Sequence, residues 1–160
     1  MPSGKTHTRL NLAALPVLGF VLITYKVTDW SLLLPSAAGF LLGTYLLNPD
    51  LDTVSAAYRN WGPLRFIWYP YRSMLPHRSF LTHTILLGDM IRVVYAAIAL
   101  SPLLYLLNCT VLGGQLPVWV QTHRPFLAAG FAGIVAASAL HIWADRLNTK
   151  RKRVFRRKRR

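Results

Sequence analysis

The chain has 160 residues, an apolar fraction of 53% and a formal net charge of +14, yet it holds only five acidic residues, all of them aspartates. A soluble surface normally mixes both signs of charge, so this composition excludes an ordinary soluble protein. The single cysteine, Cys109, excludes an internal disulfide and a thiolate zinc site, so any metal must be held by histidine and aspartate.

Four apolar stretches predict helices that cross a membrane, at residues 10–25, 30–47, 84–107 and 126–143. A spanning helix needs about 20 apolar residues, so the last three stretches are long enough and the first is marginal. The first also resembles a signal peptide, but no A-x-A-type cleavage site follows it, and we expect a first span instead. The alternative, that these stretches are core helices of a soluble protein, is disfavoured because there are four of them and the chain has so few acidic residues for a soluble surface. The sequence therefore predicts an all-α fold, a four-span transmembrane helical bundle.

Positive charge predicts the orientation of these spans. The N-terminus, the 48–83 loop and the C-terminal tail lie on one side and hold most of the basic residues, whereas the other side holds only Lys26 and Arg124. Basic residues accumulate on the cytoplasmic side. We therefore expect an inner-membrane protein with both termini in the cytoplasm and a cytoplasmic interfacial loop. A membrane-embedded metal-binding domain, residues 1–150, would precede a polybasic cytoplasmic tail, residues 151–160.

Histidines and aspartates fall at the span ends that this topology places on the cytoplasmic face. His141 and Asp145 are four residues apart, so they project from one face of a helix. The run NPDLD follows the second span, where its Asn-Pro pair ends the helix. We place His7 before the first span, His77 in the loop and His83 at the start of the third helix. The candidate metal ligands are, in chain order, His7, Asp50, Asp52, His77, His83, His141 and Asp145.

Five segments together resemble a known family: MPSGKTH, NPDLD, RNWGPLRFIWYPYR, HRSFLTH and the late HxxxD. They are similar to small bacterial integral-membrane proteins labelled as metal-binding, which in turn resemble membrane-bound metal-dependent hydrolases. The resemblance implies metal binding by His7, by Asp50 or Asp52, and by His77, His83, His141 and Asp145. One position departs from the pattern, because Thr8 stands where an acidic residue is expected after the first histidine.

The leading functional hypothesis is a metal-dependent hydrolase acting on a phosphoester or lipid-linked phosphate at the cytoplasmic face. Mixed histidine and carboxylate ligands suit a divalent transition metal, zinc first, with manganese or iron as alternatives. Asp52 or its neighbour Asp50 could serve as general base, and Arg78 could stabilise charge on a phosphoryl oxygen. Ser79 and Thr82 are expected to support the ligands by hydrogen bonds or to cap a helix.

Two other classes of function remain open from sequence. A non-catalytic metal-binding or transport protein could use Asp89 and Arg92, although these are better explained as an i,i+3 pair that offsets burial. A lipid- or nucleic-acid-binding protein could use the basic tail and the aromatic segment 59–74. Beside a membrane that segment is typical of an interfacial belt, in which Arg65 and Arg72 contact lipid headgroups or a substrate phosphate.

Small residues in the fourth span have a structural interpretation. The run GFAG, residues 130–133, would permit close helix contact within one chain or between chains of a homo-oligomer.

Overall fold

The structure, a computed structural model, describes residues 4–76 and 79–157, and every regular element in these residues is a helix. The long helices are α1 (Gly4–Thr24), α2 (Trp30–Tyr45), α6 (Leu87–Thr110) and α8 (Arg124–Arg157). The short ones are η1 (Pro49–Asp52), α3 (Ala56–Asn60), η2 (Gly62–Trp68), α4 (Tyr69–Met74), α5 (Phe80–His83) and α7 (Leu116–Thr122). Four segments are long and apolar enough to cross a membrane: Thr6–Thr24, Trp30–Asp52, Leu87–Thr110 and Arg124–Thr149. The all-α fold with four candidate spans is confirmed.

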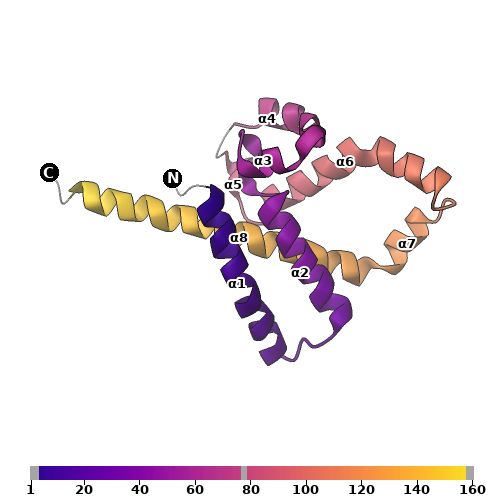
Figure 1. The fold of residues 1–160 in the computed structure, drawn as a ribbon, viewed down its shortest axis with the longest axis horizontal. Coiled ribbons are helices and arrows are strands. Elements are labelled where there is room, and N and C mark those ends of the chain that lie inside the picture. Colours follow the sequence, from indigo (N-terminus) through magenta and orange to yellow (C-terminus); the bar gives the residue numbers. More distant parts are fainter. Residues whose placement is uncertain (1–3, 77–78, 158–160) are drawn as a thin grey trace.

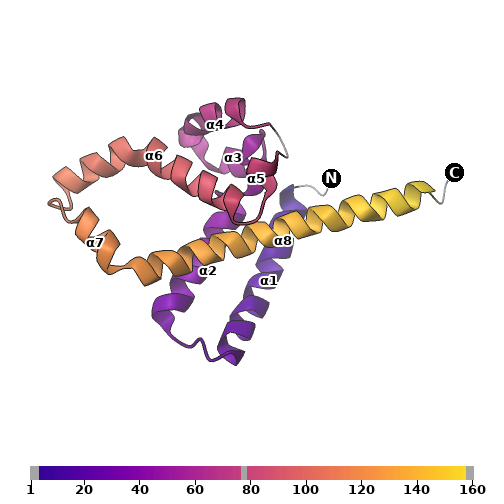
Figure 2. The same ribbon diagram turned by 180° about the vertical axis from the view of Figure 1, so that it is seen from behind.

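The helices are arranged around the oblique crossing of α8 over α1 and α2. Figure 1 shows α1 and α2 as an antiparallel hairpin, with the short helices α3, α4 and α5 gathered at the end of α2. Seen from behind, α8 passes in front of both α2 and α1 and continues beyond them (Figure 2). Helices α6 and α7 form an outer arm that starts near α5 and returns to the beginning of α8.

The crossing of α2 and α8, the most extensive helix contact among the described residues, depends on glycine. A Cβ added at Gly39 would lie 1.8 Å from the carbonyl oxygen of Gly130, and one at Gly133 would lie 2.0 Å from that of Ser36. Any larger residue would force the backbones apart. The GFAG run predicted to permit close helix contact is therefore used within the chain, against α2.

Three helix boundaries differ from those predicted. Helix α1 begins at Gly4, so His7 lies inside the helix and not before it. Leu86, with a φ of 73°, separates α5 from α6, so His83 lies at the end of α5 and not at the start of the third span, and Asp89 lies in the first turn of α6. Helix α8 continues to Arg157, across the residue where the polybasic tail was predicted to begin.

The predicted aromatic belt is only partly at the surface. Trp68 and Tyr71 are 0% and 2% exposed and form a buried core with Leu51, whereas Phe66 and Tyr69 face outward. This part of the prediction was wrong because Trp68 and Tyr71 pack edge-on against each other, beneath the short helices. The burial of Leu51 fixes the backbone of η1 and so sets the directions of the two aspartates that flank it. Burying such a side chain stabilises a fold by about 1.5–3 kcal/mol.

Much of the surface of the candidate spans is apolar and exposed. Only 11% of the apolar window is buried in each of α1 and α6, and side chains such as Phe20, Val94 and Ile98 face outward. A soluble monomer rarely exposes so large an apolar area. Such a surface is suited to contact with lipid.

Candidate metal centre

Histidines and aspartates from four parts of the chain meet where α1, η1, α5 and α8 come together. The structure brings together six of the seven residues predicted as ligands: His7, Asp50, Asp52, His83, His141 and Asp145. The other predicted ligand, His77, lies outside the described residues, as does Arg78, which was predicted to act in catalysis. The distances given for the cluster therefore involve neither residue.

The first half of the cluster joins the two ends of the chain. His7 Nε2 of α1 lies 3.1 Å from Asp145 Oδ1 of α8, and the rings of His7 and His141 are 4.1 Å apart between centroids. One ligand atom from each of His7, His141 and Asp145 lies within 4.8 Å of the others. Both histidines are almost fully enclosed, at 4% and 1% exposure. The predicted i,i+4 geometry holds, because Asp145 follows His141 by one turn of α8.

The second half of the cluster is centred on η1. Asp50 Oδ2 lies 3.5 Å from His141 Nε2, and its other oxygen, Oδ1, lies 3.9 Å from His83 Nε2. The opposite ring nitrogen of the same histidine, His83 Nδ1, lies 3.7 Å from Asp52 Oδ2. The Asp52 side chain is fully buried, whereas those of Asp50 and His83 are 23% and 14% exposed. The cluster is therefore closed around α1 and α8 and partly open at Asp50.

These residues fit a divalent metal ion. Two ligand atoms about 2.1 Å from one ion, at tetrahedral or octahedral angles, lie roughly 3.0–3.4 Å apart. The His7–Asp145 separation of 3.1 Å lies within that range, and the His141–Asp50 separation of 3.5 Å lies just beyond it. In addition, Asp50 Oδ1 and His141 Nε2 are buried, have no hydrogen-bond partner among the described residues and face neighbouring candidate ligands. Buried polar atoms are almost always satisfied, so such orphaned atoms in a ring of ligand groups indicate a missing cation.

Charge also favours a cation at this position. Three carboxylates, Asp50, Asp52 and Asp145, lie within one largely buried cluster. Positive charge on both His7 and His141 would be unfavourable, because their rings lie 4.1 Å apart between centroids, where two like charges repel each other in a weakly screened environment. A divalent ion would offset two of the three carboxylate charges without placing positive charge on the imidazoles.

Several supporting side chains were missed by the sequence analysis. Asn48 links two candidate ligands, because its Oδ1 accepts a hydrogen bond of 3.0 Å from the Asp50 amide and its Nδ2 lies 3.4 Å from His141 Nδ1. Asn11, one turn after His7, donates to Thr44 Oγ1 at 3.0 Å and so ties α1 to α2. The spacing of Asn11 could have indicated this role, because it lies four residues after His7 within an apolar run. Polar side chains inside such a run usually have a structural or functional partner.

Behind the cluster lies a buried ion pair. Asp89 and Arg92 pair as predicted from their i,i+3 spacing, and both are fully buried. Ser138 of α8 donates to Asp89 Oδ1 at 2.6 Å, and Arg92 Nη1 donates to the Thr82 carbonyl at 2.9 Å. The pair therefore ties α6 to both α5 and α8, beside His83 and one turn from His141. Burial raises the pKa of the nearby Tyr71 hydroxyl above its usual value, an effect that Arg92 partly offsets.

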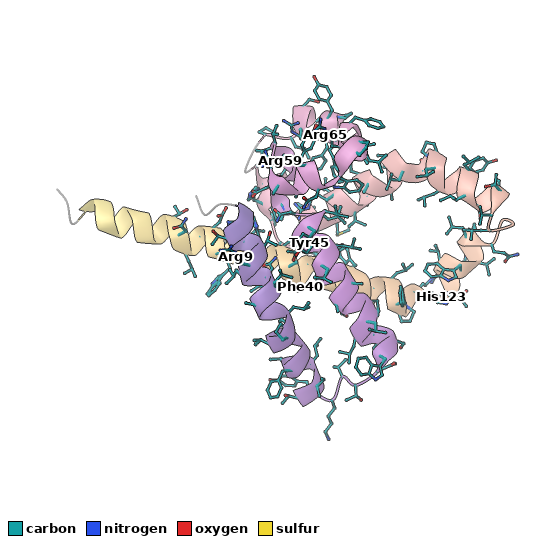
Figure 3. All side chains as sticks on the ribbon, in the orientation of Figure 1. Arg9, Phe40, Tyr45, Arg59, Arg65 and His123 are labelled. Atoms are coloured by element: carbon teal, nitrogen blue, oxygen red, sulfur yellow. The ribbon has the colours of Figure 1, made fainter. Side chains whose placement is uncertain are left out.

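The arginines predicted to contact headgroups lie on the short helices. Figure 3 places Arg59 and Arg65 there, beyond the end of α2. Arg72 is half-buried, with its guanidinium 4.6 Å from the centre of the Tyr58 ring. Headgroup or substrate contact by Arg65 and Arg72 stays a prediction. His123, which carried no role in the sequence analysis, lies at the opposite end of the molecule and stacks on Trp119.

Comparison with known proteins bears on this cluster. A family model described as "Uncharacterized metal-binding protein (DUF2227)" matches residues 2–155. An "Uncharacterized protein" of Aquifex aeolicus (strain VF5) is 38% identical over 63 residues, which make up 39% of this chain and 44% of that protein. The chain thus aligns with less than half the length of that relative. No solved structure matches the chain significantly. Neither description names a hydrolase, so the family match supports metal binding and leaves the chemistry open.

Proposed function

The chain belongs to this metal-binding family (DUF2227), and we propose that it is a membrane-bound, metal-dependent hydrolase. The metal lies between α1, η1 and α8, and the substrate is a phosphoester or a lipid-linked phosphate at the cytoplasmic membrane face. Zinc is the first candidate for the ion, with manganese and iron as alternatives, because the ligands are imidazoles and carboxylates without any thiolate.

One observation carries the metal site. His7 and His141 come from opposite ends of the chain, are 4% and 1% exposed, and direct ring nitrogens at Asp145 and Asp50. Burying two histidines and two aspartates together is costly unless their charges and lone pairs are satisfied. A cation would offset the aspartate charges and accept lone pairs from the imidazoles, and the neighbouring helices would hold these ligands in place.

Hydrolysis is supported by the opening at Asp50. A structural metal site is closed by protein ligands, whereas a catalytic site keeps a position for water or substrate. Asp50 and His83 are 23% and 14% exposed, so the cluster is less enclosed on this side than at His7 and His141. A bound transition metal would supply Lewis-acid polarisation and acidify a water molecule. The buried Asp52 is better placed to orient His83 than to act as base.

The proposed substrate class follows from position and charge. The candidate ligands lie at the ends of the predicted spans, and Arg65 and Arg72 lie on the short helices that surround this end. Arginines bind phosphate oxygens through two parallel hydrogen bonds. A phosphate group delivered at the membrane surface would meet both the arginines and the open side of the cluster.

The test of the metal site is elemental analysis of the full chain purified in detergent. Wild type is compared with His141→Ala and with His123→Ala, a matched histidine at the far end of the molecule. We expect about one or two equivalents of a transition metal in the wild type, unchanged in His123→Ala and lost in His141→Ala. Equal metal content in His141→Ala and wild type would refute the site.

The test of hydrolysis follows on the same samples. Stripped protein is reloaded with zinc or manganese and assayed with phosphomonoester and phosphodiester chromogenic substrates in mixed micelles. We expect turnover that disappears with a chelator and in His141→Ala. A protein that binds metal, is monodisperse and turns over neither substrate class would indicate a structural metal that fastens α1 and α8 together.

A further inference from the structure

Asp50 occupies an unusual position, because its two oxygens face two different histidines. Oδ2 lies 3.5 Å from His141 Nε2 on one side, and Oδ1 lies 3.9 Å from His83 Nε2 on the other. The two histidines belong to different helices, α8 and α5. The Asp50 backbone is held by Pro49 at the start of η1 and by the Asn48 side chain, which accepts from its amide at 3.0 Å. A carboxylate presented in this way has the geometry of a bridge.

His83 is turned toward this bridge by its other neighbours. Its Nδ1 lies 3.0 Å from Thr82 Oγ1 and 3.7 Å from Asp52 Oδ2. Histidines that bind metal through one ring nitrogen usually donate the N–H of the other to a carboxylate or similar acceptor. Thr82 and Asp52 supply such acceptors, and they leave the Nε2 lone pair directed at Asp50.

We propose that the protein has two metal subsites and that Asp50 bridges them. This inference rests on the metal site proposed above. The first subsite is formed by His7, His141 and Asp145, and the second by His83 Nε2 with Asp50 Oδ1. Asp52 is a positioning residue for His83 and not a ligand.

Distance and charge both agree with two ions. A bridging carboxylate holds two metal ions about 3.5–4 Å apart, and each of its oxygens then shares an ion with other ligands. The separations of 3.5 and 3.9 Å on either side of Asp50 leave room for one ion against each histidine. Asp50, Asp52 and Asp145 carry three negative charges, so one divalent ion leaves one of them without compensation, and a second ion leaves one positive charge that a phosphate substrate would offset. Paired ions at this spacing suit displacement at phosphorus, so the second subsite favours a phosphate ester as substrate.

The second subsite also accounts for the open side of the cluster. Its two proposed ligands, His83 and Asp50, have side chains that are 14% and 23% exposed. An ion held by so few protein ligands keeps coordination positions for water or substrate oxygens. The buried first subsite, by contrast, is enclosed by two histidines at 4% and 1% exposure.

The experiment uses the full chain in detergent, stripped with a chelator and reloaded with Mn²⁺ alone. Bound Mn²⁺ is counted by elemental analysis, and electron paramagnetic resonance reports whether two ions are magnetically coupled. We expect two equivalents and an exchange-coupled spectrum in the wild type. His83→Ala should bind one equivalent and give the spectrum of an isolated ion, while His123→Ala should match the wild type.

Two further variants separate bridging from positioning. Asp50→Asn, which replaces one carboxylate oxygen by an amide, should abolish the coupled signal even where Mn²⁺ still binds. Asp52→Asn should keep both sites at saturating Mn²⁺ and weaken the second about 10- to 100-fold, as expected for a residue that orients a ligand. Loss of the second ion at all Mn²⁺ concentrations in Asp52→Asn would make Asp52 a ligand and overturn its positioning role.

The outcomes distinguish this inference from the proposed function. One equivalent in the wild type, with no coupled signal, overturns the second subsite and leaves the metal centre standing. Two equivalents retained in His83→Ala also overturn it. No Mn²⁺, zinc or iron in the wild type overturns both proposals. The coupled spectrum of the wild type is decisive by itself, so a variant that fails to fold does not leave the proposal untested.

Discussion

Gly39 gives a direct test of whether the α2–α8 crossing positions the metal centre. In Gly39→Ala, the new Cβ would lie 1.8 Å from the Gly130 carbonyl oxygen, whereas ordinary contact begins at 3.4 Å. The obstacle is backbone and cannot rotate away, so the helices must separate by roughly 1.5 Å. Helix α2 leads into Asp50, and α8 carries His141 and Asp145. Metal ligands tolerate displacements of only about 0.2 Å, so a change that touches no ligand should still disrupt binding.

The matched control is Gly19→Ala. Gly19 also lies within a long helix, but a Cβ added there would meet nothing within 4 Å. Replacing a helical glycine by alanine stabilises an exposed site by up to about 1 kcal/mol, whereas overpacking a close contact costs about 1–3 kcal/mol. The same chemical change should therefore have opposite signs at the two positions.

The assay is competition for metal against a chelator of known affinity, together with the midpoint of unfolding in detergent. We expect at least about a tenfold loss of metal affinity in Gly39→Ala, equivalent to roughly 1.4 kcal/mol, and no loss in Gly19→Ala. If the metal affinities of Gly39→Ala and Gly19→Ala agree within twofold, the α2–α8 crossing does not set the positions of the ligands.

Four other predictions follow from the same contacts. Asn48→Leu should weaken metal binding about 10- to 100-fold in the competition assay, because Asn48 contacts both Asp50 and a histidine. Asp89→Asn should destabilise the protein by about 3–5 kcal/mol in detergent unfolding, and a double change with Arg92→Met should recover part of the loss. Removal of metal by a chelator should speed hydrogen exchange in α1 more than in α2 or α8. Cys109, the single cysteine and exposed, should react with a membrane-impermeant maleimide added to spheroplasts and not with the same reagent added to inverted vesicles, whose outer surface is the cytoplasmic face.

The helices and most candidate ligands could be predicted from sequence because both leave local signals. Apolar runs of spanning length identified α1, α2, α6 and α8, and a shared membrane face grouped the histidines and aspartates before any geometry was known. The i,i+4 spacing of His141 and Asp145 places them on one helix face in any α-helix. These conclusions required only length, charge and helical periodicity.

The helix ends and the supporting contacts could not be predicted in the same way. The break at Leu86, where φ is 73°, depends on the packing of α5 and on no residue with a turn preference. The burial of Trp68 beneath the short helices likewise reflects tertiary packing, since the same composition suits a membrane interface. Which oxygen of Asp50 faces which histidine follows from the placement of η1 between three helices. Sequence spacing carries no information on that arrangement.

Helix α1 shows why the metal matters for the fold as well as for chemistry. Lipid-facing apolar surface gives no preference for one docking position, because hydrocarbon is as apolar as leucine. The polar contacts of α1 with the rest of the molecule include those of Asn11, with Thr44 and the Ala137 carbonyl, and those of His7, with Asp145 and His141. Hydrogen bonds between membrane helices contribute only about 0.6–2 kcal/mol each, so Asn11 alone would hold α1 weakly. A metal bound by His7 and by two residues of α8 would fix the position of α1. The free energy of metal binding would then stabilise the docking of α1 against α8, and the metal would assemble the site that binds it.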